Sequence, residues 1–183
     1  AGLQIPILVM GYVMPALVRE AIENNISVMV NSFELAREFN EAANGSKKSL
    51  FAHVKVDSGM HRLGLLPDQL VPFANGARSL SNLKFEGIFT HFPNADDLKD
   101  ESTKQHIRCF TEAVDLLKSS GIEPEIVHAA NSAASLYFPE ARFDAIRPGI
   151  AIYGLNPDFG APLPEDFEAA LTWKGRITSI KTI

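Results

Sequence analysis

Four short stretches of the sequence carry residues that could do chemistry: HVKVDSGMHRLG (53–64), GIFTHF (87–92), HAANSAAS (128–135) and IRPGIAIYG (146–154). In the first, Lys55 and Asp57 interrupt a β-branched run, and Arg62 follows a Ser-Gly turn. Burying ionisable groups costs free energy unless they have partners, and shifted pKa values gather at functional sites. A functional lysine is therefore expected here, with a purely structural Lys55–Asp57 pair as the alternative.

The other stretches offer a histidine and groups suited to an anion. His91 ends one apolar run, while Asn131 and Ser132 begin a short helical pattern, where free N–H groups and the helix dipole favour a phosphate. Plain helix capping is the alternative for these two residues. Arg147 ends a further run, and Gly149 lets backbone N–H groups approach a ligand closely. Two such loops in succession favour a phosphorylated ligand.

Composition narrows the choice of partners. The 17 basic and 22 acidic residues give a net charge of −5, and no basic cluster is present, which argues against nucleic acid or an anionic membrane as a partner. Cys109 is the only cysteine, which fits a reducing, cytoplasmic location. The apolar residues 5–18 are interrupted by proline and fall short of the roughly 20 needed to span a bilayer. The histidines lack metal-ligand spacing, so no metal is expected.

Apolar runs alternate with helical patterns along most of the chain. Strands are predicted at 5–9, 26–30, 50–57, 84–91, 124–129 and 143–147, and helices at 15–24, 33–44, 67–80, 101–120 and from residue 132. Asn31 or Ser32 would cap the second helix. This α/β alternation predicts a parallel sheet, either an open doubly wound sheet or a barrel. The polar face of 50–57 (Phe51, His53, Lys55, Asp57) favours a barrel, whose lumen it would line below the carboxyl ends where active sites form.

The character of the sequence changes near its end. We expect residues 1–160 to form a partial (β/α) TIM barrel, with about six of the eight strands, that binds the cofactor. Residues 161–183 would be a Pro/Gly-rich linker and LTWKGRITSIKTI (171–183), the first strand of a following β-domain. The start at Ala1 and this isolated last strand suggest a fragment.

Together KVDSGMHRLG, GIFTHF, HAANSAAS and IRPGIAIYGL resemble the alanine racemases in order and approximate spacing, and PILVMG (6–11) resembles the third barrel strand of that family. The resemblance implies a (β/α)₈ barrel followed by a β-domain, in a homodimer. It also implies an isomerase that interconverts L- and D-alanine with pyridoxal 5′-phosphate and supplies D-alanine for peptidoglycan.

The resemblance implies a role for each candidate residue. Arg62 would contact the substrate carboxylate, and Lys55, which is often carbamylated in this family, would steady Arg62. His91 would pack against the pyridine ring, and Arg147 would hydrogen-bond its nitrogen. The phosphate would be held by Asn131, Ser132, Gly149 and Ile150, with Met10 close to the cofactor.

Arg147 carries information about the reaction. A permanently charged arginine keeps the ring nitrogen unprotonated, which favours simple proton removal and return at Cα. Related barrel decarboxylases carry a carboxylate at this position, so Arg147 argues against them.

The resemblance also points to missing parts and to alternatives. The family's Schiff-base lysine lies in a segment resembling VVKANAYGHG, which these 183 residues do not contain, and its catalytic tyrosine belongs to the β-domain. The chain alone is therefore expected to be inactive. A pyridoxal-phosphate homeostasis protein without racemase activity, or a racemase for another amino acid such as serine, remains the alternative.

Overall fold

The computed structural model describes residues 5–158, 160–170 and 172–182. A parallel sheet of five strands has the order β1-β2-β3-β4-β5, so that every strand pairs with the next one in sequence. An open doubly wound sheet reverses its strand order part-way, whereas a barrel does not. The sheet is therefore part of a barrel wall. Its strands are β1 (Ile7–Val9), β2 (Ile26–Val30), β3 (Leu50–Lys55), β4 (Leu83–Phe89) and β5 (Ile126–His128).

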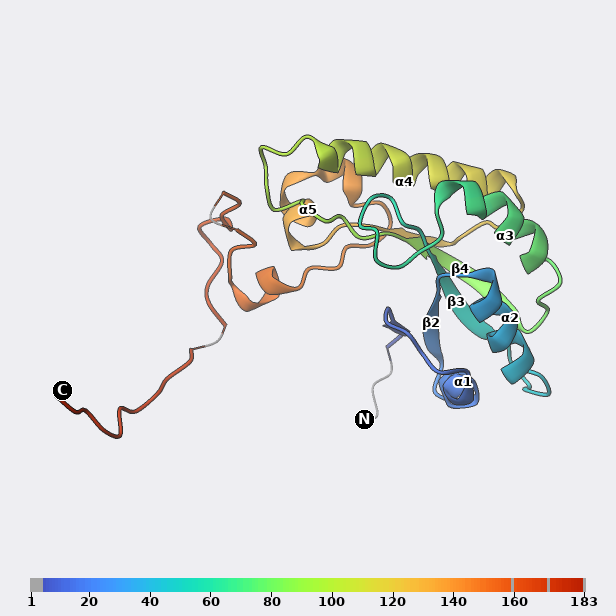
Figure 1. Ribbon diagram of the computed structural model, residues 1–183, viewed down its shortest axis with the longest axis horizontal. Coiled ribbons are helices and arrows are strands. Elements are labelled where there is room, and N and C mark those ends of the chain that lie inside the picture. Colours follow the sequence, from blue (N-terminus) through green and yellow to red (C-terminus); the bar gives the residue numbers. More distant parts are fainter. Residues whose placement is uncertain (1–4, 159, 171, 183) are drawn as a thin grey trace.

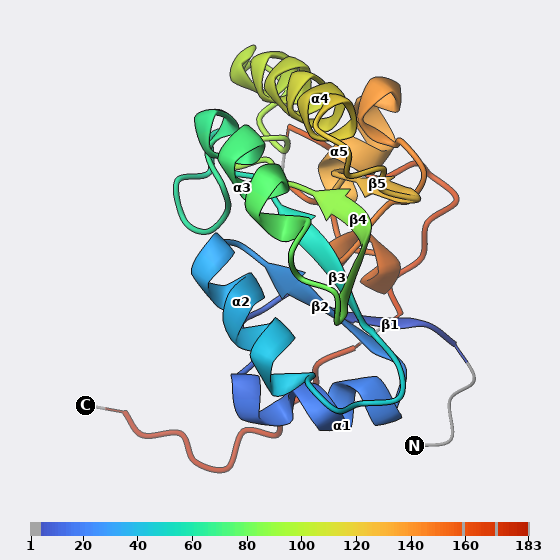
Figure 2. The ribbon, with the colours of Figure 1, turned by 90° about the vertical axis from the view of Figure 1, so that its right-hand side faces the viewer.

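Helices connect the strands and cover one face of the sheet, as Figures 1 and 2 show. The α-helices are α1 (Val18–Glu23), α2 (Phe33–Ala42), α3 (Leu70–Ala77), α4 (Ser102–Ser119) and α5 (Ser132–Tyr137). The predicted helix at 15–24 begins with a 3₁₀ turn at Pro15–Leu17, and that at 67–80 begins with one at Pro67–Gln69. Of the two predicted caps for α2, Ser32 is the one used, since its Oγ accepts the N–H of Leu35 at 3.1 Å.

The main hydrophobic core lies between the helices and the outer face of the sheet. Val28, Val54 and Ile88 from adjacent strands are fully buried there, together with Phe39 of α2 and Phe110 of α4. Because successive strand residues point to opposite faces, this packing turns the alternate residues of the same strands toward the other face. The predicted alternation in 50–57 is confirmed in this way.

The sixth predicted strand, at 143–147, does not form. It makes a single isolated bridge, between His128 and Ala145. Phe143 adopts a left-handed conformation with φ of 42°, and the side chain of Asp144 takes the N–H of Val127 at 2.8 Å. The Asp144 carboxylate thus accepts the Val127 N–H, which a backbone carbonyl of a neighbouring strand would otherwise have accepted. The segment still follows β5, since the N–H of Arg147 donates to the Ala130 carbonyl at 2.8 Å.

The expected final strand is also absent from the described residues. Residues 172–182 form neither helix nor strand and run away from the sheet, as Figure 1 shows, with Trp173 92% exposed and Ile180 83% exposed. The first and last residues of the predicted strand, 171 and 183, lie outside the described residues. An isolated strand is not stable without a neighbour to pair with, and no described segment offers one. The proposed boundary at residue 160 stays a prediction.

Across the described ranges, no helix has both the length and the apolar character required for crossing a bilayer.

We expect the chain to self-associate at micromolar concentration. The outer edge of β1 has no partner strand among the described residues, and Ile5, Ile7 and Tyr12 nearby are 63%, 38% and 62% exposed. Unpaired edges with exposed apolar side chains favour edge-to-edge contact. Light scattering should give a mass above 20.0 kDa, and Ile7→Lys should lower it. A stable monomer of the unsubstituted chain would contradict this expectation.

Candidate functional site

The inner face of the sheet carries a line of large polar and aromatic side chains. His53 and Lys55 of β3, Phe89 of β4 and His128 at the end of β5 are all buried. The pairing of β3 with β4 shifts register between Ala52 and His53. Met29, which pairs with His53, is also buried on this face, and neither Met29 nor Phe89 belongs to the hydrophobic core between the sheet and the helices. The inner face therefore forms a second layer, separate from that core.

Lys55 is buried beside other cations. Its Nζ lies 5.3 Å from the centre of the Phe89 ring. Burial lowers the pKa of Lys55, the nearby charges of Arg62 and Arg147 lower it further, and Asp57 opposes them. Lys55 and Asp57 form no ion pair in the described structure, and Asp57 Oδ1 instead accepts the N–H groups of Gly59 and His61, each at 3.0 Å. The alternative of a structural Lys55–Asp57 pair is therefore not the arrangement observed.

The loop after β3 brings Arg62 to the rim. Asp57 closes the turn through the two N–H groups just described, and Gly59 has φ of 141°, a conformation that favours glycine. A Cβ at Gly59 would also lie 2.3 Å from Nε2 of His106 on α4. Arg62 is exposed, but its charge lowers the pKa of both Lys55 and His91. The loop therefore brings the Arg62 charge close enough to act on both side chains.

Arg147 is held by neutral acceptors. Its Nη1 donates to Nδ1 of His128 at 2.8 Å, and its Nη2 donates to the carbonyls of Thr90 at 2.6 Å and Ala129 at 2.9 Å. Burial lowers the pKa of Arg147 to about 10, still well above neutral pH, so it stays charged. A guanidinium has five N–H donors. The Nε–H and one Nη1–H have no hydrogen-bond partner among the described residues, so they are free to donate to a ligand.

A cavity of about 350 Å³ brings together most of the predicted cofactor residues. It is lined by His91, Asn131, Ser132, Arg147, Gly149 and Ile150, together with Phe92, Pro93, Asp96, Ala133 and Pro157. Burial, and then the charges of Arg147, Lys55 and Arg62, lower the pKa of His91. The cavity is therefore next to several positive charges and suits an anionic ligand.

The loops around this cavity are joined by hydrogen bonds. Asn131 caps α5, because its Oδ1 accepts the N–H of Ala134 at 3.0 Å. Ser132 Oγ accepts the N–H groups of Gly149 at 2.8 Å and Ala151 at 3.3 Å. The capping alternative holds for Asn131, while Ser132 ties the two predicted phosphate loops together. Both loops consequently present their polar groups to the same space.

Met10 is the predicted cofactor residue that the structure does not bring to this cavity. It follows β1 and is 43% exposed, and β1 and β5 are the two edge strands of the sheet. Its predicted role therefore has no support from the geometry. Sequence reasoning also missed Asp96, which lines the cavity, and the contacts of His53 and His128. The alternation that placed His53 on the polar face was the available signal for the last two.

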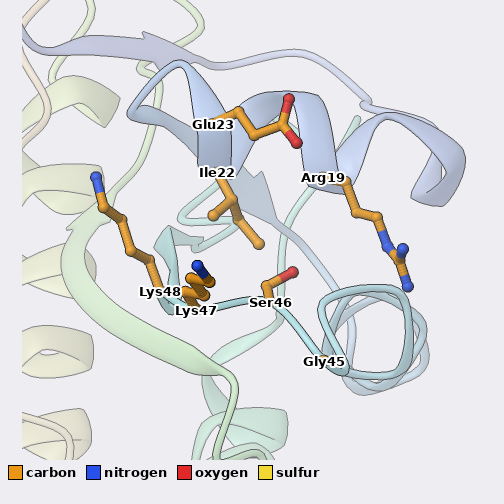
Figure 3. A pocket seen from close by; sticks show the side chains of 7 residues that line it. All are labelled: Arg19, Ile22, Glu23, Gly45, Ser46, Lys47 and Lys48. Atoms are coloured by element: carbon orange, nitrogen blue, oxygen red, sulfur yellow. The ribbon is translucent and has the colours of Figure 1, made fainter.

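A second hollow, of about 360 Å³, lies between α1 and the loop from α2 to β3 and is shown in Figure 3. It is lined by Arg19, Ile22, Glu23, Gly45, Ser46, Lys47 and Lys48. Arg19 donates to the carbonyls of Ala42 and Asn44, so it ties this loop to α1. None of the predicted site residues lines it.

Residues 1–157 match the family model described as "Alanine racemase, N-terminal domain". The chain belongs to the alanine racemase family. Among curated relatives, alanine racemases from Desulfovibrio desulfuricans and Desulforamulus reducens are 36% and 38% identical to it, in each case over 100% of this chain. The alignments cover 49% and 50% of those proteins, so the chain spans about half the length of the curated relatives it matches.

Solved alanine racemases share the fold of this chain. The Bacillus anthracis alanine racemase with bound L-Ala-P superimposes with a TM-score of 0.85 and 36% identity, covering 92% of this chain and 44% of that one. The Clostridium difficile 630 alanine racemase in complex with cycloserine gives a TM-score of 0.83 and 34% identity, covering 87% and 44%. The predicted partial barrel is confirmed, with five strands in place of about six.

We predict that acid destabilises this alanine racemase domain through His128. Burial, the charge of Arg147 and His53 lower the pKa of His128 to about 3. Between pH 6.5 and 3 the unfolded chain therefore binds a proton that the folded chain does not, and stability falls as pH falls. The loss from His128 alone should be about 1.4 kcal/mol at pH 5.5 relative to pH 7.5.

Urea unfolding at the two pH values measures this loss. Replacing His128 by Asn should shrink the difference, and the same replacement at His61, whose side chain is 78% exposed, serves as the control. Equal pH dependence in the His128→Asn variant and the original chain would contradict the assignment.

Proposed function

We propose that this chain is the cofactor-holding part of an alanine racemase that uses pyridoxal 5′-phosphate. The observation that carries the proposal is the cavity beside Arg147, where the predicted cofactor residues His91, Asn131, Ser132, Gly149 and Ile150 meet. A volume of about 350 Å³ lies within the range of roughly 300–1,000 Å³ for small-molecule sites. The residues present therefore fit a small phosphorylated ligand.

Each of these residues has a role that its contacts support. Ser132 Oγ accepts the N–H of Gly149 where the two loops meet, and its own O–H would donate to the phosphate. The free N–H groups of Arg147 would donate to the ring nitrogen, and His91 would lie against the ring. When bound, the cofactor supplies a conjugated ring that withdraws electrons from the substrate Cα. Because Arg147 would donate a hydrogen bond without giving up its proton, the ring nitrogen would stay unprotonated and the ring would withdraw electrons only moderately. A moderate withdrawal suits the removal and return of a single proton at Cα.

The substrate would bind where Arg62 projects over the rim. Arg62 offers two parallel N–H donors to a carboxylate, and the charges of Arg62 and Arg147 both act on Lys55 beside them. Because burial lowers the pKa of Lys55, more of its amine is neutral and able to react with CO₂. A carbamylated Lys55 would place a negative charge opposite Arg62 and steady it. The bound L-Ala-P of the Bacillus anthracis enzyme supports alanine as the substrate class.

The remaining parts of the proposal concern the whole protein. We infer a homodimer in the cytoplasm that supplies D-alanine for peptidoglycan, on the strength of the family alone. The identity of 36% and 38% to curated alanine racemases over the full chain favours this function over a homeostasis protein. Activity toward serine in place of alanine is the alternative that a substrate assay decides.

Cofactor binding by the chain tests the cavity directly. Pyridoxine 5′-phosphate is the probe, because it has no aldehyde to react with surface lysines. It should bind with measurable affinity in a fluorescence titration, while pyridoxine without phosphate should bind at least roughly tenfold more weakly, since it cannot use the charge-assisted bonds of the two loops.

Arg147→Lys should weaken binding of the same probe roughly 10- to 100-fold, because a hydrogen bond to a charged group is lost. Arg108→Lys, at an exposed position of α4, is the matched control and should leave the affinity unchanged. Equal affinity for the probe with and without its phosphate, or no effect of Arg147→Lys, would refute the assigned cavity.

Racemisation is a separate prediction. With pyridoxal phosphate and L-alanine, the 183-residue chain should form no D-alanine above the rate of free cofactor, because no segment resembling VVKANAYGHG supplies a cofactor lysine. Chiral chromatography measures the product. Turnover by the pure chain would show that another lysine carries the cofactor, and preferred turnover of serine by a complete enzyme containing the chain would correct the substrate.

A further inference from the structure

A continuous line of hydrogen bonds runs from Arg147 along the inner face of the sheet to its opposite end. Arg147 Nη1 lies 2.8 Å from His128 Nδ1, and His128 Nε2 lies 2.9 Å from His53 Nδ1. His53 Nε2 in turn lies 3.3 Å from Oε1 of Glu86, which also accepts the hydroxyl of Ser27. The line thus starts at the Arg147 cation in the cofactor cavity and ends at the carboxylate of Glu86 in β4.

The two ends fix the direction of every bond between them. A guanidinium only donates, so His128 Nδ1 must accept and carry no proton. A neutral His128 then holds its proton on Nε2 and donates to His53 Nδ1. His53 is left with its proton on Nε2, which points at the Glu86 carboxylate, an acceptor. Burial lowers the pKa of both histidines, so the neutral forms are the ones to consider.

The opposite direction would disturb Arg147. If His53 held its proton on Nδ1, it would donate to His128 Nε2, and His128 would hold its own proton on Nδ1. That proton would face the Nη1–H of Arg147, donor against donor, at a heavy-atom distance of 2.8 Å. A carboxylate beside His53 Nε2 prevents this state, because it can accept a proton there and has none to donate.

The packing keeps the two imidazole rings in this line. His128 stacks on Phe89 with ring centres 5.0 Å apart and planes 9° apart, and meets His53 edge-on at 74°. Gly87 makes room for His53, since a Cβ there would lie 2.1 Å from its Nδ1. With both rings held in place, only the tautomer of each histidine can still vary.

We propose that Glu86 is a positioning residue for Arg147, acting through His53 and His128 by fixing both imidazoles as their Nε2–H tautomers. Its consequence for the cofactor rests on the proposed function, because it assumes that Arg147 meets the ring nitrogen. The tautomers themselves do not depend on that assumption. Glu86 lies outside the cofactor cavity and so does not touch the ligand.

Nitrogen-15 NMR of the histidine side chains in the 183-residue chain, without cofactor, tests the proposal. In the original chain, Nδ1 of His53 and of His128 should give the signal of an unprotonated nitrogen and Nε2 that of a protonated one, and His53→Asn and His128→Asn assign the signals. Glu86→Gln is the deciding variant, because a carboxamide has the same shape but can donate as well as accept. It should produce a second set of signals from the Nδ1–H tautomers, in which Arg147 Nη1 no longer donates to His128.

The matched control is Glu125→Gln, which removes an exposed carboxylate paired with Lys84 and should leave the tautomers unchanged. Circular dichroism confirms that each variant is folded, and Glu86→Leu, which offers neither donor nor acceptor, should also give mixed tautomers. A single Nε2–H tautomer retained at both histidines in Glu86→Gln and Glu86→Leu would overturn the proposal, as would Nδ1–H tautomers in the original chain.

Titration with pyridoxine 5′-phosphate measures the consequence for the cavity. Glu86→Gln should weaken binding of pyridoxine 5′-phosphate several-fold. The ratio of its affinity to that of pyridoxine, which measures the contribution of the phosphate, should stay unchanged. Mixed tautomers with unchanged affinity would uphold the role of Glu86 toward Arg147 and refute the contact between Arg147 and the ring nitrogen. The two failures are therefore distinguishable.

Discussion

The site depends on a half-buried guanidinium, that of Arg147, which is held without a carboxylate in contact. Two backbone carbonyls and one imidazole nitrogen accept from Arg147, so its charge is solvated but not cancelled. An ion pair at this position would have pulled the guanidinium toward the carboxylate and used the donors now left for a ligand. Neutral acceptors instead fix its plane and leave the positive charge to act on the cavity. The lowered pKa values of His91, His128 and Lys55 all include this charge among their causes.

The parallel sheet makes such an arrangement possible. Every strand runs in the same direction, so the loops after β3, β4 and β5 all open at one edge, and their residues meet although they are far apart in sequence. The outer face carries the hydrophobic core with the helices, which leaves the inner face free for polar groups. A strand buried on both sides by apolar layers could not have held His53, Lys55 and the line to Glu86 without unpaired polar atoms.

Part of this could be predicted from the sequence. The alternation in 50–57 and the loops after three strands foretold a common rim for Lys55, Arg62, His91 and Arg147, because the side-chain period of a strand is fixed. The sixth strand could not be foreseen, since its failure depends on the side chain of Asp144 and the φ of Phe143. The role of Met10 stays a prediction, because Met10 follows β1 and does not line the cavity beside Arg147. The alternation placed His53 on the inner face, but its contact with His128, 75 residues away, also depends on a register shift between β3 and β4 that the alternation does not predict.

The absent side chain at Gly87 limits which residues β3 and β4 of this chain can carry side by side. The imidazole of His53 occupies the volume that any other residue at position 87 would need, so the two positions behave as one packing unit. An alanine at 87 is compatible only with a smaller partner at 53, and a smaller partner breaks the line between His128 and Glu86. In this chain the line therefore requires the histidine at 53 and the glycine at 87 together, across two adjacent strands.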